Sequence, residues 1–319
     1  MVQQYQRILV AGGAGFIGSH IVEALLETGA EVTVLDNLFT GRMSNLKSFV
    51  GNKDFHFIRG DVRDAGQVRA AIRNIDAVFN DAAIVSVRMS IENPVLVNEV
   101  NVNGTLNLLK ASVDSEVKRF VQASSASVYG DADRLPIVEE APFKPISPYA
   151  VSELSAESYA QAFHEVYGLE TVCLRYFNVF GPRQLYGPYT GAITIFMNQL
   201  MSSEQATIFG DGEQTRDFVY VEDVASANLL ALTKKEAAGE AFNIATGTAT
   251  SINTLVKTLM EIVGKPDMKL LRTQPKPGEI KHSVASIEKA RRILDYKPVF
   301  SIDTGLRQLV KWCTSKSIH

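Results

Sequence analysis

The chain has 319 residues, of which 46% are hydrophobic and 21% are charged, and its formal net charge is −3 at pH 7. This length predicts about two domains, and the composition excludes disordered, collagen-like and coiled-coil proteins. The slight acidity argues against a general nucleic-acid-binding protein, because such binding depends mainly on an excess of cationic side chains.

Short apolar runs alternate with amphipathic stretches through the first half of the chain. Apolar residues at helical spacing, such as Ile17, Ile21 and Leu25, lie between these runs, and longer helices are expected at residues 98–111 and 148–167. Strands are expected at residues 8–11, 32–35, 55–58, 77–79, 120–122 and 171–174. Such alternation predicts an α/β fold with a doubly wound parallel sheet. After Asn178 the elements become shorter and glycine and proline more frequent, which indicates a smaller mixed α/β C-terminal lobe.

A glycine-rich loop, VAGGAGFIG at residues 10–18, joins the first expected strand to the first expected helix. Glycines there let the backbone approach a pyrophosphate, which then lies at the N–H groups of the helix N-terminus. Asp36 follows 18 residues after Gly18, where a carboxylate binds ribose hydroxyls and disfavours a 2′-phosphate. The glycines alone would also suit an ordinary tight turn. Together with the strand, helix and acid they predict a site for NAD, with contacts from Gly12, Gly15, Phe16, Ile17, Gly18, Asp36 and Asn37.

Asp61 and Val62 follow the third expected strand. This position places them beside the adenine of the bound NAD, although a plain polar strand end is an equally simple interpretation.

Two further segments carry a resemblance to a known family. SSASVYG at residues 124–130 ends the fifth expected strand, and SPYAVSE at residues 147–153 opens the next long helix. With the glycine loop, NVNGT at 101–105, RYFN at 175–178 and QTRDFVYVED at 214–223, they make the chain similar to extended short-chain dehydrogenases/reductases. Within that family it most resembles UDP-sugar 4-epimerases. The resemblance implies an NAD-binding Rossmann-type domain at 1–177, to which 217–241 return, and a nucleotide-sugar lobe at 178–216 and 242–319.

The resemblance also implies the catalytic residues. Oxidation of an alcohol needs a group that takes the hydroxyl proton, and a tyrosine does so when its pKa, normally about 10, is brought toward neutrality. Tyr149 occupies the place of the family's tyrosine base, which also contacts NAD, and Ser125 the place of the serine that binds the reacting oxygen. Ala82 lies where the family lines the nicotinamide side of the cleft.

The family's lysine, four residues after the tyrosine, is replaced by Glu153. A carboxylate on the same helix face disfavours the phenolate. Three interpretations remain open: a natural substitution compensated by other positive charge, a slow or non-catalytic relative that binds the same ligands, or an introduced change. A second departure is Asn80-Asp81, where the family usually has His-Leu, and a solvated strand end is the plain alternative for Asp81.

The reaction type follows from the same comparison with the family. Dehydratases carry Asp-Glu directly after the serine position, whereas this chain has Ala126 and Ser127. We therefore expect epimerisation at C4 of a UDP-hexose or UDP-N-acetylhexosamine through a transient 4-keto sugar. Decarboxylation of a UDP-glucuronate-type substrate is the alternative reaction, and binding of NAD and a nucleotide sugar without catalysis is the alternative function.

Further positions match the family's substrate contacts. Arg216 corresponds to its diphosphate-binding arginine, although a salt bridge to a neighbouring aspartate would also explain it. Asn178 corresponds to the asparagine at the sugar–diphosphate junction, and Lys276 stands in place of an arginine. Ser283 falls at the gate beside the sugar's C2 group, where a small residue leaves room for an N-acetyl group. The resemblance also implies a homodimer formed by the helices at 98–111 and 148–167.

The remaining expectations concern location and metals. Cys173 and Cys313 are too few for a disulfide framework or a four-cysteine zinc site, and the histidines lack metal-ligand spacing, so no metal is predicted. No apolar run reaches the length of a membrane span, and no signal peptide precedes the first expected strand. We therefore expect a soluble, cytoplasmic protein without a membrane or nucleic-acid partner.

Overall fold

A seven-stranded parallel sheet forms the larger lobe of the computed structural model, which describes residues 5–184, 191–275 and 280–316. The strand order β10-β6-β5-β4-β1-β2-β3 is that of a doubly wound sheet, so the predicted Rossmann-type α/β fold is confirmed. The strands are β1 (Arg7–Ala11), β2 (Glu31–Asp36), β3 (Phe55–Arg59), β4 (Ala77–Asn80), β5 (Arg119–Ser125), β6 (Glu170–Tyr176) and β10 (Ala241–Ile244).

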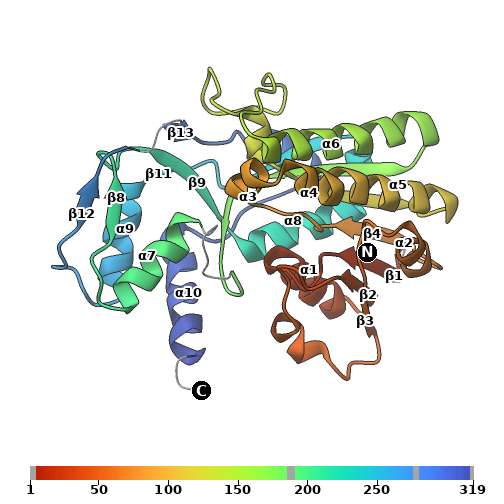
Figure 1. Cartoon of the computed structure of the whole chain (residues 1–319), viewed down its shortest axis with the longest axis horizontal. Coiled ribbons are helices and arrows are strands. Elements are labelled where there is room, and N and C mark those ends of the chain that lie inside the picture. Colours follow the sequence, from red (N-terminus) through yellow and green to blue (C-terminus); the bar gives the residue numbers. More distant parts are fainter. Residues whose placement is uncertain (1–4, 185–190, 276–279, 317–319) are drawn as a thin grey trace.

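Helices cover both faces of this sheet, as Figure 1 shows. Because successive side chains of a strand point to opposite faces, Ile8 and Val10 of β1 enter one core while Leu9 and Ala11 enter the other. The first core is closed by α1 (Phe16–Glu27) and α8 (Val221–Thr233), and the second by α2 (Ala65–Ala71), α5 (Gly104–Asp114) and α6 (Pro148–Tyr167). Burial on both faces explains why the central strands β1 and β4 are almost continuously apolar, whereas the edge strand β3 is partly exposed.

The helix expected at residues 98–111 differs from the prediction in its start and in its regularity. After α3 (Val87–Glu92), helical structure begins again at α4 (Pro94–Asn98), and a π-helical turn, η4 (Glu99–Asn103), joins it to α5. The proline at the first turn costs no hydrogen bond, and the side chain of Asn93 caps the helix by accepting from Leu96 N. The turn at η4 contacts α6.

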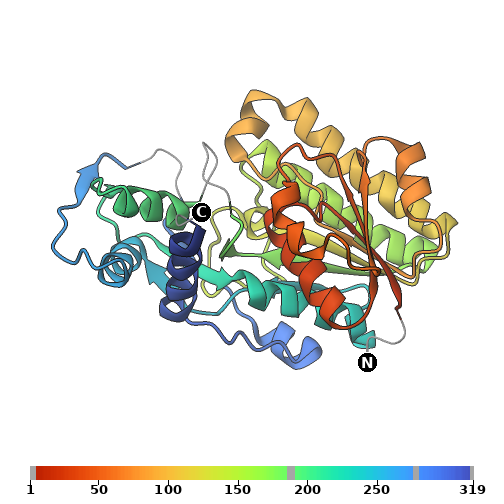
Figure 2. The same cartoon turned by 90° about the horizontal axis from the view of Figure 1, so that it is seen from below.

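The smaller lobe is built on short strands around β9 (Thr215–Tyr220). β7 (Asn178–Phe180), β11 (Ala249–Ser251) and β13 (His282–Ser283) pair with it, while β8 (Thr207–Phe209) pairs with β12 (Leu271–Thr273). The helices of this lobe are α7 (Ala192–Met201), α9 (Ile252–Ile262) and α10 (Ile302–Lys316). They pack around a core that contains Phe196, Leu255 and Leu306, to one side of the large sheet in Figure 2.

The chain passes between the lobes more often than the sequence indicates. Within the segment 217–241, α8 packs against α1, but β10 continues to Ile244 beside β6, so the expected boundary at residues 241 and 242 falls inside a strand. The segment with η7 (Ala290–Leu294) also packs on the large lobe, since Ala290 and Leu294 belong to its core. The remaining short helices are η2 (Met43–Asn45), η3 (Lys47–Phe49), η5 (Ala126–Tyr129) and η6 (Lys235–Ala237). None of the described helices is long and apolar enough for a membrane span.

Candidate active site

The glycine loop lies between β1 and α1 at the carboxyl edge of the sheet. Gly12 has φ +79°, and a Cβ there would come within 2.6 Å of the backbone carbon of Asp81, so only glycine fits. Gly15 caps α1 without a side-chain hydrogen bond, and the first turn holds no acid. The N-terminus of α1 borders a cavity lined by Gly12, Gly15, Phe16, Ile17 and Gly18. Its unpaired N–H groups are therefore available to bind a diphosphate in this cavity.

Asp36 stands at one end of this loop, where β2 ends. Its Oδ2 accepts a hydrogen bond from Ala14 N at 3.0 Å, and its Oδ1 accepts one from Leu38 N at 2.7 Å. Burial raises the pKa of Asp36, and these two N–H groups oppose the shift. Because each carboxylate oxygen has a second lone pair, Asp36 still has acceptor capacity for the ribose hydroxyls in the cavity it lines.

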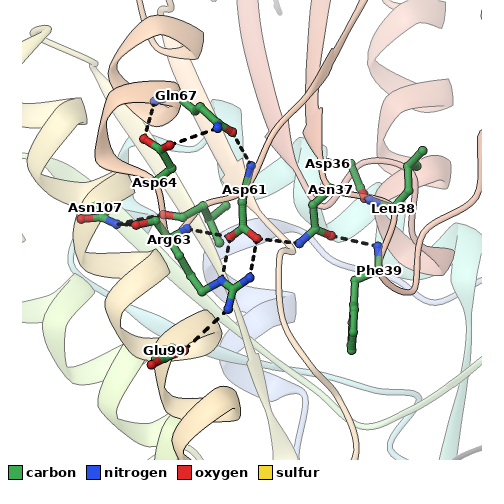
Figure 3. A network of polar contacts seen from close by, with 11 residues as sticks. Asp36, Asn37, Leu38, Phe39, Asp61, Arg63, Asp64, Gln67, Glu99 and Asn107 are labelled. Atoms are coloured by element: carbon green, nitrogen blue, oxygen red, sulfur yellow. Dashed lines mark hydrogen bonds and ion pairs between the residues drawn. The ribbon is translucent and has the colours of Figure 1, made fainter.

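Figure 3 shows the polar network beside Asp36. Asn37 Nδ2 donates to Asp61 Oδ2 at 2.9 Å, and Arg63 donates to both Asp61 oxygens at 3.0 and 2.8 Å. The hydrogen bonds from Arg63 hold the pKa of Asp61 below its ordinary value. Asn37, Val62 and Arg63 line the cavity. Asp61 is not among the residues that line the cavity, and it holds Asn37 and Arg63 in position by hydrogen bonds. The position of Arg63 at the cavity was not predicted from the sequence.

Tyr149 and Ser125 lie together in the cavity that the glycine loop lines. Ser125 ends β5, and Tyr149 lies in the first turn of α6, which Ser147 caps by accepting from Ala150 N at 3.1 Å. Both side chains line the same cavity as the glycine loop and Ala82. Burial raises the pKa of Tyr149, the charge of Glu153 raises it further, and a hydrogen bond with Ser125 opposes the rise.

Glu153 lies one turn after Tyr149 on the same face of α6, and it is 6% exposed. Its Oε1 accepts a hydrogen bond from Asn101 Nδ2 at 3.2 Å. Burial, and then the charge of Glu157, raise the pKa of Glu153 to about 8, while Asn101 opposes the shift. Burial likewise raises the pKa of Asp81 to about 7. Both carboxyl groups therefore still bind protons near neutrality, where ordinary acids are ionised.

A second cavity, of about 770 Å³, adjoins the first, and its volume is in the range of small-molecule pockets. Ser125 lines both cavities. Asn178, Arg216 and Ser283 line the second one, because β13 pairs with β9 and sets Ser283 opposite Arg216. Asn178 Nδ2 donates to the backbone oxygen of Asp217 at 3.1 Å. Four of the five expected substrate contacts thus share one cavity, and the fifth, Lys276, lies outside the described residues.

Comparison with known proteins now identifies the family. Residues 8–245 match the NAD dependent epimerase/dehydratase family. The chain belongs to this family. A putative UDP-glucose 4-epimerase of Methanocaldococcus jannaschii is 40% identical over 307 residues, which cover 96% of this chain and 97% of the relative.

Two solved structures have the same fold along almost the whole chain. UDP-glucose 4-epimerase of Thermotoga maritima with UDP-glucose has a TM-score of 0.92 and 38% identity, over 98% of this chain and 100% of that one. UDP-N-acetylglucosamine 4-epimerase of Methanobrevibacter ruminantium in complex with UDP-N-acetylmuramic acid has a TM-score of 0.93 and 37% identity, over 98% of this chain and 99% of that one. The predicted family and NAD as its cofactor are thereby confirmed. The cradle at Gly12 and the uncapped start of α1 fit this cofactor.

Asn101 is a functional candidate that sequence reasoning missed in this epimerase/dehydratase chain. Besides Glu153 it donates to Ser152 Oγ at 3.0 Å, and its Oδ1 accepts from Ile84 N at 2.8 Å. It therefore ties α6 to the segment after β4. Asn101 lies in the π-helical turn, and such turns often mark functional sites, but the sequence alone does not reveal them.

A buried ion pair holds the strand that carries Ser125 against α6. Glu157 accepts a hydrogen bond from Ser124 Oγ at 2.6 Å and pairs with Arg175 of β6 at 2.5 Å. Arg175 also donates to the hydroxyl of Tyr129, which in turn donates to Asn243 of β10 at 2.7 Å. The positive charge of Arg175 is thus paired with Glu157, one helical turn after Glu153. This pair holds β5, β6 and α6 in their relative positions.

Proposed function

We propose that this protein interconverts UDP-sugars that differ in configuration at C4. The observation that carries the proposal is the position of Ser125, which lines both the cofactor cavity and the adjoining substrate cavity, with Tyr149 beside it. A sugar hydroxyl bound there lies between the phenol and the cofactor. Relatives named UDP-glucose 4-epimerase and UDP-N-acetylglucosamine 4-epimerase support the same reaction.

Each side chain has a defined part in this proposal. Tyr149 takes the proton from the C4 hydroxyl and returns it after the 4-keto sugar has turned its other face, while Ser125 donates a hydrogen bond to the reacting oxygen. NAD, when bound, supplies the hydride acceptor. Ala126 and Ser127 line the substrate cavity after Ser125, so this segment brings no carboxylic acid to eliminate water, which favours epimerisation over dehydration.

The substrate cavity supports a UDP-sugar with either a plain or an N-acetylated hexose. Arg216, on β9, offers a planar donor group that suits a diphosphate, and Asn178 lies beside it on β7. Ser283 leaves space opposite Arg216, where a larger side chain would restrict the C2 substituent. Lys276 is proposed as a further diphosphate contact.

Glu153 favours a second candidate function, the binding of NAD and a nucleotide sugar without turnover. The burial of Tyr149 keeps this phenol protonated, and Glu153, where ionised, adds to the effect, whereas a lysine at position 153 would oppose it. The two candidates differ in a direct assay, since only an enzyme converts one C4 epimer into the other.

The assay incubates the purified protein separately with UDP-glucose, UDP-galactose, UDP-N-acetylglucosamine and UDP-N-acetylgalactosamine, and separates the epimers by chromatography. We expect conversion in both directions and a loss of at least about a hundredfold in Tyr149→Phe. Tyr167→Phe, which changes an exposed tyrosine at the end of the same helix, is the matched control and should retain full activity. Absence of conversion of all four sugars, with ligand binding intact, would contradict the proposed epimerisation of these sugars and favour the second candidate.

We also propose that two copies associate through α6 and the helix that begins at Pro94. Val151, Tyr159 and Val166 recur at helical spacing on an exposed face of α6, and Val95 of the neighbouring α4 is exposed as well. Sedimentation velocity should give a dimer, and Val151→Glu should shift it to a monomer. A wild-type monomer at assay concentrations would contradict the proposal.

A further inference from the structure

Two acidic side chains from different elements line the cofactor cavity. Asp81 follows β4 and its backbone lies against Gly12, while Glu153 projects from α6. Asp36 lines the adjoining cavity and Asp81 lines both, whereas Glu153, Tyr149 and Ser125 line only the cofactor cavity of these two. The adenosine half of NAD would therefore occupy the cavity of Asp36, and the nicotinamide half the cavity that holds both acids. The pair therefore borders the end of the cofactor that changes its redox state.

The surroundings of Glu153 contain further negative charge. The charged side chains that act on it are Glu157, one turn further along α6, and Asp81. Asn101, from the π-helical turn, supplies a hydrogen bond to its carboxyl group. The guanidinium of Arg175 is paired with Glu157, which limits what its charge contributes at Glu153.

Asp81 and the two nearby phenols complete the set of titratable groups. Burial raises the pKa of Tyr176 on β6, and the charge of Asp81 adds to this, while Asn228 holds the Tyr176 hydroxyl by a hydrogen bond of 2.8 Å. Burial also raises the pKa of Tyr149, and the charge of Glu153 adds to this rise. Both phenols are neutral throughout the range in which the acids titrate, so the charge of this cavity is set by Asp81 and Glu153.

The nicotinamide ring carries a positive charge in NAD+ and none in NADH. A carboxylate beside it stabilises the oxidised form only, and in a partly buried site this attraction is stronger than in water. We propose that Asp81 and Glu153 together make the protein selective for NAD+ over NADH and couple the binding of NAD+ to the release of a proton from the pair. The inference requires NAD in the cavity and does not depend on epimerisation.

The direction of the pH effect follows from linkage. With pKa values of about 7 for Asp81 and about 8 for Glu153, the pair is mostly neutral in slightly acidic solution and ionised in alkaline solution. The ratio of NAD+ affinity to NADH affinity must therefore rise with pH across this range. Because a carboxylate in a partly buried site attracts the charged ring more strongly than it would in water, we expect the ratio to change by at least about tenfold between the neutral and the ionised pair.

The experiment measures which form of the cofactor the holoprotein retains. Full-length protein is dialysed against equal amounts of NAD+ and NADH at a series of pH values from about 6.5 to 9, until the bound fraction is constant. The bound cofactor is then released by denaturation and quantified by chromatography. We expect the bound NAD+:NADH ratio to rise about tenfold or more over the series.

Variants assign this effect to the pair. Glu153→Gln and Asp81→Asn remove one charge each with little change in shape, and each should reduce the pH dependence. The double variant should bind the two forms in a ratio that is constant with pH. Glu165→Gln removes an exposed acid from the same helix and should behave as wild type. A wild-type ratio that does not vary with pH, or a double variant that keeps the wild-type dependence, would refute the proposal. The measurement on the wild-type protein tests the proposal even where a variant fails to fold.

Discussion

Replacement of Glu153 by lysine should increase epimerisation if Tyr149 is the base. Side chains at i and i+4 of a helix lie about 6 Å apart, and at an effective dielectric constant of about 20 a unit charge at this distance contributes about 2.8 kcal/mol. This corresponds to about 2 pKa units for the phenol. Since Glu153 has a pKa of about 8 and is mostly neutral at pH 7, the substitution chiefly adds the stabilising positive charge.

Asp81 reduces the effect of this single substitution. A new ammonium group at position 153 would pair with the Asp81 carboxylate, whose pKa of about 7 makes it readily ionised, and the phenol would then gain only part of the calculated shift. We therefore expect about a tenfold increase in kcat for Glu153→Lys and about a hundredfold increase for the double variant Glu153→Lys/Asp81→Leu. Glu153→Gln should change kcat little at pH 7, because it replaces a mostly neutral group with a neutral one.

The assay is initial-rate epimerisation of UDP-glucose and UDP-N-acetylglucosamine at saturating substrate, with the bound NAD quantified in each preparation. Glu165→Lys, which adds the same charge on the exposed side of α6, is the matched control and should leave kcat unchanged. A folded, NAD-loaded double variant no faster than wild type would refute the electrostatic reasoning. An equal increase in Glu153→Gln and Glu153→Lys would show that loss of the acid, rather than gain of a cation, is responsible.

Three further predictions concern the substrate, the cofactor and stability. Ser283→Tyr should lower kcat/KM for N-acetylated sugars at least about tenfold relative to plain hexoses, because the side chain enters the cavity opposite Arg216; an unchanged ratio would remove its gate role. Asp36→Ser should weaken NAD binding and reduce discrimination against NADP, measured by competition between the two cofactors, since the repelling carboxylate is lost. Glu153→Gln should raise the Tm of cofactor-free protein more at pH 8 than at pH 5. In the unfolded chain Glu153 ionises near its usual pKa of 4.5, whereas in the folded protein it keeps its proton to about pH 8. The free energy of unfolding therefore falls as the pH rises from about 4.5 to about 8, and the substitution removes this loss. Equal changes in Tm at both pH values would contradict this.

The pattern of the sequence was sufficient to predict the large sheet and the regions that border the cofactor. Strands buried on both faces are continuously apolar, and the loop between β1 and α1 has a glycine spacing that few other structures need. Ser125 and Tyr149 were expected together because the motifs that contain them resemble those of the family, and both line one cavity. The family, the fold class and NAD as cofactor followed from these residues.

Other features depend on contacts that no local pattern records. The π-helical turn that directs Asn101 toward Glu153 differs from an α-helix by one residue, which a periodicity of 3.6 cannot reveal. The pairing of β13 with β9, which brings Ser283 opposite Arg216, joins residues far apart in the chain through a strand of only two residues. The bidentate pairing of Arg63 with Asp61 is likewise a matter of side-chain geometry and not of composition.

The late position of β10 in the chain has a consequence for synthesis and for truncation. β6 keeps an unpaired edge until residues 241–244 have been made, and Tyr129 lacks its partner Asn243 until then. A ribosome must therefore synthesise residues 1–244 before the dinucleotide lobe can close, and at that point α9 and α10 of the smaller lobe have still to be translated. For this reason a fragment that ends near residue 177 would expose a sheet edge and aggregate, and the two lobes must be expressed as a single chain.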